Sequence, residues 1–94
     1  MNSKLVDIVI VNWNTGDLLK NCLNSIKRLQ DQCIESVVIV DNGSTDDSLI
    51  KINTDMHNLK IVKEKINHGF GKACNIGADL CKSKYILFLN PDTE

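Results

Sequence analysis

The sequence predicts an α/β protein built on a mostly parallel sheet with helices on its faces. The apolar runs are short, continuous and rich in β-branched residues, as in strands that are buried on both sides. Between them lie segments whose apolar residues recur every three or four positions, which is the helical period. This alternation favours a layered sheet with right-handed crossovers.

Each element can be placed in order along the chain. The strands are expected at 8–11 ("IVIV"), 37–40 ("VVIV"), 60–62 (the weaker "KIV") and 85–89 ("YILFL"). Helices are expected at 18–29, from Ser44 onward, and at 70–81. The second of these helices is predicted from Ser44 as N-cap and from Asp46 and Asp47, whose charges complement the positive end of a helix.

Length and composition limit the kind of protein. The 94 residues are enough for one domain, 1–94, with 43% hydrophobic and 24% charged residues. A formal net charge of -1 gives no general attraction to nucleic acid. The four cysteines lack zinc-ligand spacing and are expected to be reduced, mostly buried thiols. The N-terminal apolar run is too short for a signal or a membrane span, so a cytoplasmic location is expected.

Polar residues gather where the strands end. The four exits read "NWNTGD" from Asn12, "DNGSTDD" from Asp41, "INHGFGKACN" from Ile66, and "NPDTE" from Asn90. Ligands of open α/β sheets bind outside the carboxyl ends of the strands. With strand order 3-2-1-4, the tips of the second and fourth strands lie roughly 10 Å apart. A nucleoside diphosphate could span that distance.

The residues that follow the strands each suggest a function. Trp13 could cover a flat pyrimidine ring, Asp41 and Asn42 could hold the base or ribose, and Asp92 could bind a hard divalent cation. Gly69 and Gly71 suggest close backbone approach to a phosphate or sugar.

Each of these signals also has a purely structural interpretation. "DNGS" is good turn chemistry, Trp13 could pack on a helix, and Asp92 could cap a helix. His68 is more often a surface loop residue than a base.

Taken together, "VDIVIVNWN", "VVIVDNGSTD", "NHGFGKACNIG" and "YILFLNPDTE" resemble the family 2 glycosyltransferases over nearly the whole chain. The resemblance implies a Rossmann-like GT-A three-layer fold, of which 1–94 is the N-terminal, nucleotide-sugar-binding part. It also implies inverting transfer from a dTDP- or UDP-sugar to a glycan or lipid-linked acceptor, with Mg²⁺ or Mn²⁺. Of the family's branches, "DNGS" and "NPD" are most similar to the rhamnosyltransferase-like one.

The resemblance assigns residues as follows. Trp13 stacks near the base with Asn12 and Asn14 beside it, and Asp41 and Asn42 read the pyrimidine and ribose. The loop and helix that line the nucleotide sugar contribute Asn67, Gly69, Gly71 and Asn75. Asn90 takes the place of the first aspartate of a D-x-D metal motif, and Asp92 keeps the metal-binding carboxylate.

The resemblance also implies what this chain lacks. The acceptor-binding part and the general base are expected beyond Glu94, so the fragment alone is expected to be inactive. An incomplete sheet would leave an edge through which the chain could self-associate. In the full enzyme, a peripheral position at the inner face of the membrane is possible.

Two other functions fit an α/β layered fold: a non-catalytic nucleotide-binding module and a receiver-like signalling domain. A receiver-like domain expects an acidic cluster at the first strand's exit, where this chain has "NWN".

Overall fold

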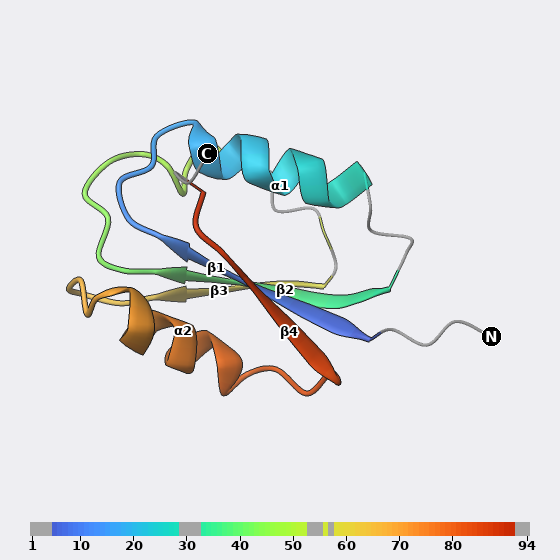
Figure 1. Ribbon diagram of the computed structural model, residues 1–94. Coiled ribbons are helices and arrows are strands. Elements are labelled where there is room, and N and C mark those ends of the chain that lie inside the picture. Colours follow the sequence, from blue (N-terminus) through green and yellow to red (C-terminus); the bar gives the residue numbers. More distant parts are fainter. Residues whose placement is uncertain (1–4, 29–32, 53–55, 57, 92–94) are drawn as a thin grey trace.

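The computed structural model describes residues 5–28, 33–52, 56 and 58–91. The elements are β1 (Val6–Asn12), α1 (Leu18–Arg28), β2 (Ile34–Asp41), β3 (Leu59–Lys63), α2 (Phe70–Ala78) and β4 (Tyr85–Leu89). The four strands form one parallel sheet in the order β3-β2-β1-β4 (Figure 1). The predicted fold class and strand order are therefore confirmed.

The register aligns the carboxyl ends of the strands. Asn12, the last residue of β1, lies opposite Asp41, the last residue of β2. On the other side of β1, Ile10 lies opposite Leu89 at the end of β4. The loops that follow β1, β2 and β4 thus leave the sheet along one edge, as predicted.

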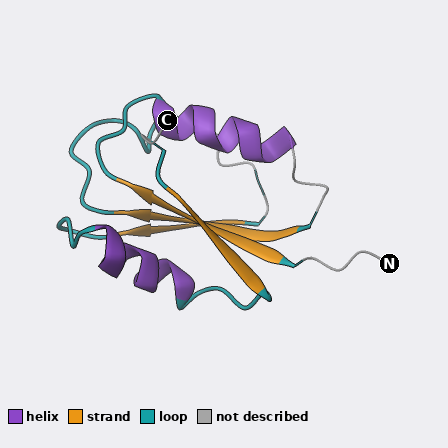
Figure 2. Cartoon of the chain, in the orientation of Figure 1, coloured by secondary structure: helices purple, strands orange, loops and turns teal. Residues whose placement is uncertain are grey.

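The sheet has a helix on each face, with α1 above and α2 below in Figure 2. Successive side chains of a strand point to opposite faces, so β1 and β2 contribute to two separate cores. Ile8, Ile10, Val37 and Ile39 pack with α1. Val9, Val11, Val38 and Val40 pack with α2. This two-sided burial explains why both strands are apolar throughout.

Gly77 lets α2 lie close against the sheet. A Cβ at this position would lie 2.4 Å from Cγ1 of Val9 and 3.1 Å from Cγ2 of Val40. Both distances are shorter than ordinary van der Waals contact, so a larger residue would push the helix outward. Close packing of α2 also fixes the position of its N-terminal end, which lies near the carboxyl edge of the sheet (Figure 1).

The helix predicted from Ser44 is wrong for the described residues up to Ile52. That stretch holds a single hydrogen-bonded turn, in which the backbone N–H groups of Ile50 and Lys51 donate to the carbonyl of Asp47. Ser44 does not cap a helix, because its hydroxyl donates to Asp41. Side-chain hydrogen bonds of this kind compete with helix formation.

At the opposite edge of the sheet, the buried carboxylate of Asp7 holds the connection between α2 and β4. It accepts hydrogen bonds from the hydroxyl of Ser36 at 2.6 Å and from the backbone N–H groups of Lys82 and Ser83, both at 2.9 Å. Burial alone would raise the pKa of Asp7, but the hydrogen bonds from Ser36, Ser83 and Lys82 together hold it below its ordinary value. Asp7 is therefore a charged anchor for the start of β4.

The cysteines are free thiols, as predicted, but they are less buried than expected. Cys33 is exposed, whereas Cys22, Cys74 and Cys81 are half-buried. Burial raises the pKa of these three thiols, which keeps them protonated and unreactive at neutral pH. In the described part of the chain, neither helix has the length or the apolar character to cross a bilayer.

Candidate functional site

The loops after β1 and β2 are joined by a buried polar network centred on Asn12. Its side-chain amide donates to the carboxylate of Asp41 at 2.8 Å, to the hydroxyl of Ser48 at 3.0 Å and, over a longer 3.3 Å, to the hydroxyl of Ser44. Its amide oxygen accepts a hydrogen bond from the Thr15 hydroxyl. Asn12 is completely buried. It therefore serves the network and presents no atom to a ligand.

Asp41 is buried in the same network. One carboxylate oxygen accepts from Asn12 and from the Ser44 hydroxyl, and the other accepts from the Ser44 backbone N–H at 3.0 Å. This arrangement fixes the turn that follows β2. In this geometry Asp41 shapes the loop, and both of its oxygens already have partners within the protein.

Nearer the surface, a second set of hydrogen bonds links the loop after β1 to the loop after β2. Asn14 adopts a positive φ of 50°, which asparagine tolerates better than most residues. Its side-chain oxygen accepts from the backbone N–H groups of Thr45 and Asp46, at 2.8 and 3.1 Å. Asp46 in turn accepts from the backbone N–H of Gly16 at 3.0 Å. Trp13 thus lies between two residues, Asn12 and Asn14, that are both held by the 44–48 loop.

Asn42 connects β2 to the loop that precedes α2. Its side-chain oxygen accepts from the backbone N–H of His68 at 3.0 Å, and its amide nitrogen donates to the carbonyl of Gly69 at 3.2 Å. Gly43 makes room for that loop, because a Cβ there would lie 2.9 Å from the backbone carbon of Ile66. With φ at +82°, Gly43 also has a conformation that other residues rarely adopt.

These connections enclose a small pocket at the carboxyl edge of the sheet, of about 190 Å³. Trp13 and Phe70 line it, and they are 50% and 48% exposed. The other lining residues are Val11, Thr15, Asn42, Asn67, Gly69 and Asn90. Among the described residues none that lines the pocket is charged, so they offer two aromatic surfaces and amide groups to an uncharged ring.

The structure brings together five of the residues predicted for the site: Trp13, Asn42, Asn67, Gly69 and Asn90 all line this pocket. It places the other predicted residues that it describes elsewhere. Asn12, Asn14 and Asp41 form the support behind the pocket. Gly71 and Asn75 lie further along α2 and do not line it.

Gly69 and Gly71, at the start of α2, differ in whether the backbone conformation requires a glycine. Gly69 has a φ of +87°, so its lack of a side chain is needed for the backbone conformation. Gly71 needs no positive φ, and a Cβ at either position would meet no protein atom within 4 Å. The surface at the start of α2 is therefore open toward solvent, which leaves room for a ligand.

Three pocket residues are absent from the predicted site: Val11, Thr15 and Phe70. In sequence, Phe70 has the helical spacing of an apolar stripe with Ala73 and Gly77. Ala73 and Gly77 are buried against the sheet, whereas Phe70 is nearly half exposed. The signal that could have found it is its position directly after "HG", where the helix begins at the functional edge of the sheet.

The predicted metal ligand, Asp92, lies outside the described residues. Within the described part of the chain, no three acidic, histidine or cysteine side chains are close enough to hold a metal ion together. The carboxylate of Asp41 is already taken up by its own loop. The described residues alone therefore do not form a metal site at this edge.

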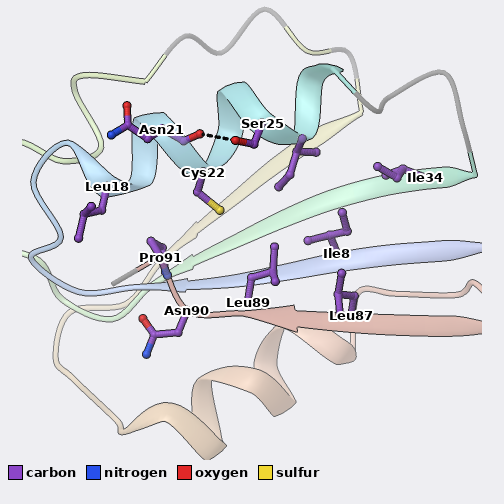
Figure 3. A pocket seen from close by; sticks show the side chains of 11 residues that line it. Ile8, Leu18, Asn21, Cys22, Ser25, Ile34, Leu87, Leu89, Asn90 and Pro91 are labelled. Atoms are coloured by element: carbon purple, nitrogen blue, oxygen red, sulfur yellow. Dashed lines mark hydrogen bonds between the residues drawn. The ribbon is translucent and has the colours of Figure 1, made fainter. Parts of the chain in front are cut away.

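A larger groove of about 470 Å³ lies between α1 and β4 (Figure 3). Leu18, Cys22 and Ile26 line it from α1, and Leu87 and Leu89 line it from β4. Its remaining lining residues are Ile8, Asn21, Ser25, Ile34, Asn90 and Pro91. Of the described residues that line it, Cys22 alone is titratable and most are apolar, so this part of the groove has the character of an uncovered packing surface.

Comparison with known proteins identifies relatives over almost the whole chain. Residues 7–94 match the family described as "Glycosyl transferase family 2". The glycosyltransferase GlyG of Streptococcus pneumoniae is 30% identical over 93 residues, which cover 96% of this chain and 31% of GlyG. A PGL/p-HBAD biosynthesis glycosyltransferase of Mycobacterium bovis is 35% identical over 95 residues, covering 98% of this chain and 37% of that protein.

A solved structure shares the fold. Glucosyl-3-phosphoglycerate synthase from Mycobacterium tuberculosis, crystallised with Mn²⁺, UDP and phosphoglyceric acid, superposes with a TM-score of 0.77 at 20% sequence identity. The match covers 95% of this chain and 33% of the synthase. The chain thus spans about a third of the length of the proteins it resembles.

Proposed function

This chain belongs to glycosyl transferase family 2, and we propose that it binds the nucleotide of an activated sugar donor for an inverting transfer. The observation that carries this proposal is the uncharged pocket lined by Trp13 and Phe70 at the carboxyl edge of the sheet. This edge is where ligands of open α/β sheets bind.

The donor we propose is a UDP- or dTDP-sugar. Support comes from the structural relative that holds UDP and Mn²⁺. A narrower proposal is a dTDP-rhamnose donor, because "DNGS" and "NPD" resemble the rhamnosyltransferase-like branch, with Asn42 and Asn90 where aspartates are more usual. An amide oxygen can still accept a hydrogen bond from a pyrimidine imide N–H.

The chain's own residues have two tasks in this proposal. The hydrogen bonds that Asn12 and Asn14 make to the 44–48 loop hold Trp13 in place between them. Asn42 holds the 67–69 loop against β2, so that Asn67 stays at the pocket. These preorganised contacts orient the nucleotide, and orientation accounts for much of the rate of a two-substrate reaction.

Completing the transfer requires groups that we propose lie in further polypeptide, as in relatives about three times as long. An acceptor hydroxyl must lose its proton to a general base as it attacks the sugar carbon, while the nucleoside diphosphate departs. Mg²⁺ or Mn²⁺ bound by Asp92 would neutralise charge on that diphosphate. We propose a glycan or lipid-linked acceptor, and an enzyme that works in the cytoplasm or at the inner face of the membrane.

The test is direct binding of nucleotides to the chain. UDP and dTDP, titrated with Mn²⁺ present, should change the fluorescence of Trp13, the only tryptophan. Calorimetry should give the same dissociation constants, and ADP should bind more weakly. Absence of binding by any pyrimidine nucleoside diphosphate would refute the proposed function.

The contribution of the metal can be tested separately. UDP should bind more tightly with Mn²⁺ than in EDTA, and Asp92→Ala should abolish that difference. Asp79→Ala, at an exposed carboxylate near the end of α2, is the matched control and should keep the metal dependence. Equal affinity with and without Mn²⁺ in the wild type would refute the role of Asp92.

A further inference from the structure

Phe70 occupies an unusual place for an aromatic residue of this chain. The chain has only four aromatic residues, and two of them, Trp13 and Phe70, line the same pocket. Both are about half exposed, and neither belongs to the two apolar cores. Packing of the fold therefore does not account for either ring.

The geometry of α2 explains why Phe70 lies at the pocket. Ala73 and Gly77 face the sheet and are buried. Phe70 is three residues before Ala73, so it continues the same helical face by about one turn. Unlike Ala73 and Gly77, Phe70 is 48% exposed, and it lines the pocket together with Val11 near the end of β1.

Trp13 reaches the pocket from a different element. It follows β1 on the loop that leads to α1, which covers one face, whereas Phe70 begins α2, which covers the opposite face (Figure 1). The two aromatic residues therefore come from different elements and line one pocket at the carboxyl edge.

The size and chemistry of the pocket indicate which part of a donor it takes. Its volume of about 190 Å³ is below the roughly 300–1,000 Å³ of sites that enclose a whole small ligand. The described residues that line it are all uncharged, so this part of the site suits the uncharged base better than the diphosphate. Aromatic surfaces bind flat rings by stacking.

We propose that Phe70 and Trp13 form a two-sided aromatic slot for the pyrimidine base, in which Phe70 is a specificity-determining residue. This inference rests on the proposed function, and it adds a contact that none of the predicted site residues supplies. Asn67 and Asn90 then line the slot with amide groups that can pair with the polar edge of the base. Asn42 is 2% exposed and already bonded to the backbone of His68 and Gly69, so it supports the slot from behind.

The experiment compares three variants at Phe70 and one control. Phe70→Ala should weaken UDP binding by roughly 5- to 150-fold, the range for loss of one base-stacking side chain. Phe70→Tyr, which keeps the ring, should restore affinity to within a few fold of wild type, whereas Phe70→Leu, which keeps apolar volume without a π face, should not. Phe88→Ala is the matched control, because Phe88 is 40% exposed on β4 and does not line the pocket.

A second ligand separates base recognition from general damage to the site. Inorganic pyrophosphate with Mn²⁺ has no base, so its affinity should be the same for wild type and Phe70→Ala. Circular dichroism should show unchanged helix content, since alanine favours helix more than phenylalanine does.

The possible outcomes distinguish this inference from the proposed function. If wild type binds UDP and Phe70→Ala or Phe70→Leu binds it equally well, the slot is refuted and the proposed function stands. If Phe70→Ala weakens UDP and pyrophosphate to the same extent, Phe70 is not a base contact and the slot is again refuted. If wild type binds no pyrimidine nucleotide, the proposed function and the aromatic slot are both refuted.

Discussion

The side-chain amide of Asn12 donates a hydrogen bond of 2.8 Å to the carboxylate of Asp41, and both residues are buried at the ends of neighbouring strands. This contact joins the first two loops of the carboxyl edge, since Asp41 also binds the turn at Ser44. A buried polar pair of this kind is costly unless every group has a partner. In the described residues every buried side-chain nitrogen and oxygen does have one. The pocket is therefore supported by a network that tolerates little change.

Replacing Asn12 with alanine should destabilise the protein and disturb the pocket together. The change leaves Asp41, Ser48 and Thr15 without the partner that Asn12 provides. Loss of one partner from a buried polar group costs about 1–3 kcal/mol, so the free energy of unfolding in urea should fall by at least this amount. UDP affinity should fall as well, because Trp13 is no longer held from both sides.

The control for Asn12 is Asn24→Ala on the exposed face of α1, which should be neutral or slightly stabilising because alanine favours helix. If Asn12→Ala unfolds at the same urea concentration as wild type, the network does not stabilise this edge.

Gly43→Ala should be more damaging than the same change at Gly16. Both glycines have positive φ, +82° and +59°, but only at Gly43 would the added Cβ collide with backbone, 2.9 Å from Ile66. At Gly16 it would meet nothing within 4 Å. The expected losses are about 1–2 kcal/mol for Gly16→Ala and about 2–4 kcal/mol for Gly43→Ala, measured by urea unfolding.

The collision at Gly43 would also shift the 66–67 backbone, which carries Asn67 to the pocket. UDP affinity should therefore fall for Gly43→Ala and stay near wild type for Gly16→Ala. Equal losses of stability in the two variants would show that the close approach of the two loops is unimportant.

Asp7 should make stability depend on pH in the acidic range. Its hydrogen bonds hold the folded-state pKa below the ordinary value of 3.8, so the carboxylate stabilises the fold above about pH 4. That contribution is lost as the pH falls through the lowered pKa of the folded state. Asp7→Asn should therefore be less stable than wild type at pH 7, by about 1–3 kcal/mol, and the difference should shrink at pH 3.

Urea unfolding at several pH values measures this effect. Asp47→Asn is the control, at an exposed carboxylate that pairs only with Lys51 at 3.4 Å among the ion pairs of the described residues. It should change stability little at either pH. A constant difference between Asp7→Asn and wild type from pH 7 to pH 3 would contradict the role of the charge.

The sequence was sufficient to predict the sheet because its strands are buried on both faces. "VVIV" at 37–40 has no polar face, and only a strand covered by helices on both sides needs that composition. The segments that follow the four strands could be predicted to lie along one edge of the sheet, because the carboxyl ends of parallel strands are all on the same side. The register then confirmed this for Asn12 and Asp41.

The side-chain contacts could not be predicted in the same way. Ser44 and Asp47 match a helix N-terminus locally, but the turn is decided by Asn12 and Asn14, which are about thirty residues away in sequence. The orientation of Asn42 depends likewise on the distant backbone of His68. Phe70 was missed because helical period alone does not show where the sheet beneath a helix ends.

The edge strand β4 should mediate self-association of this chain. Among the described strands it pairs with β1 alone, and its Tyr85, Leu87 and Phe88 are 56%, 48% and 40% exposed. Leu87 also lines the apolar groove beside α1. An exposed, apolar edge strand can pair with the same strand of a second copy, which would cover the edge and part of the groove.

Leu87→Lys should weaken this association, because a charge on an edge strand opposes pairing. Sedimentation velocity over a range of concentrations should show a shift from monomer to dimer for wild type and a smaller shift for the variant. Ile50→Lys is the control, since Ile50 is 84% exposed and lies outside the sheet, and it should associate as wild type does. A wild-type chain that stays monomeric at every concentration, or an association that Leu87→Lys leaves unchanged, would show that β4 is not the contact.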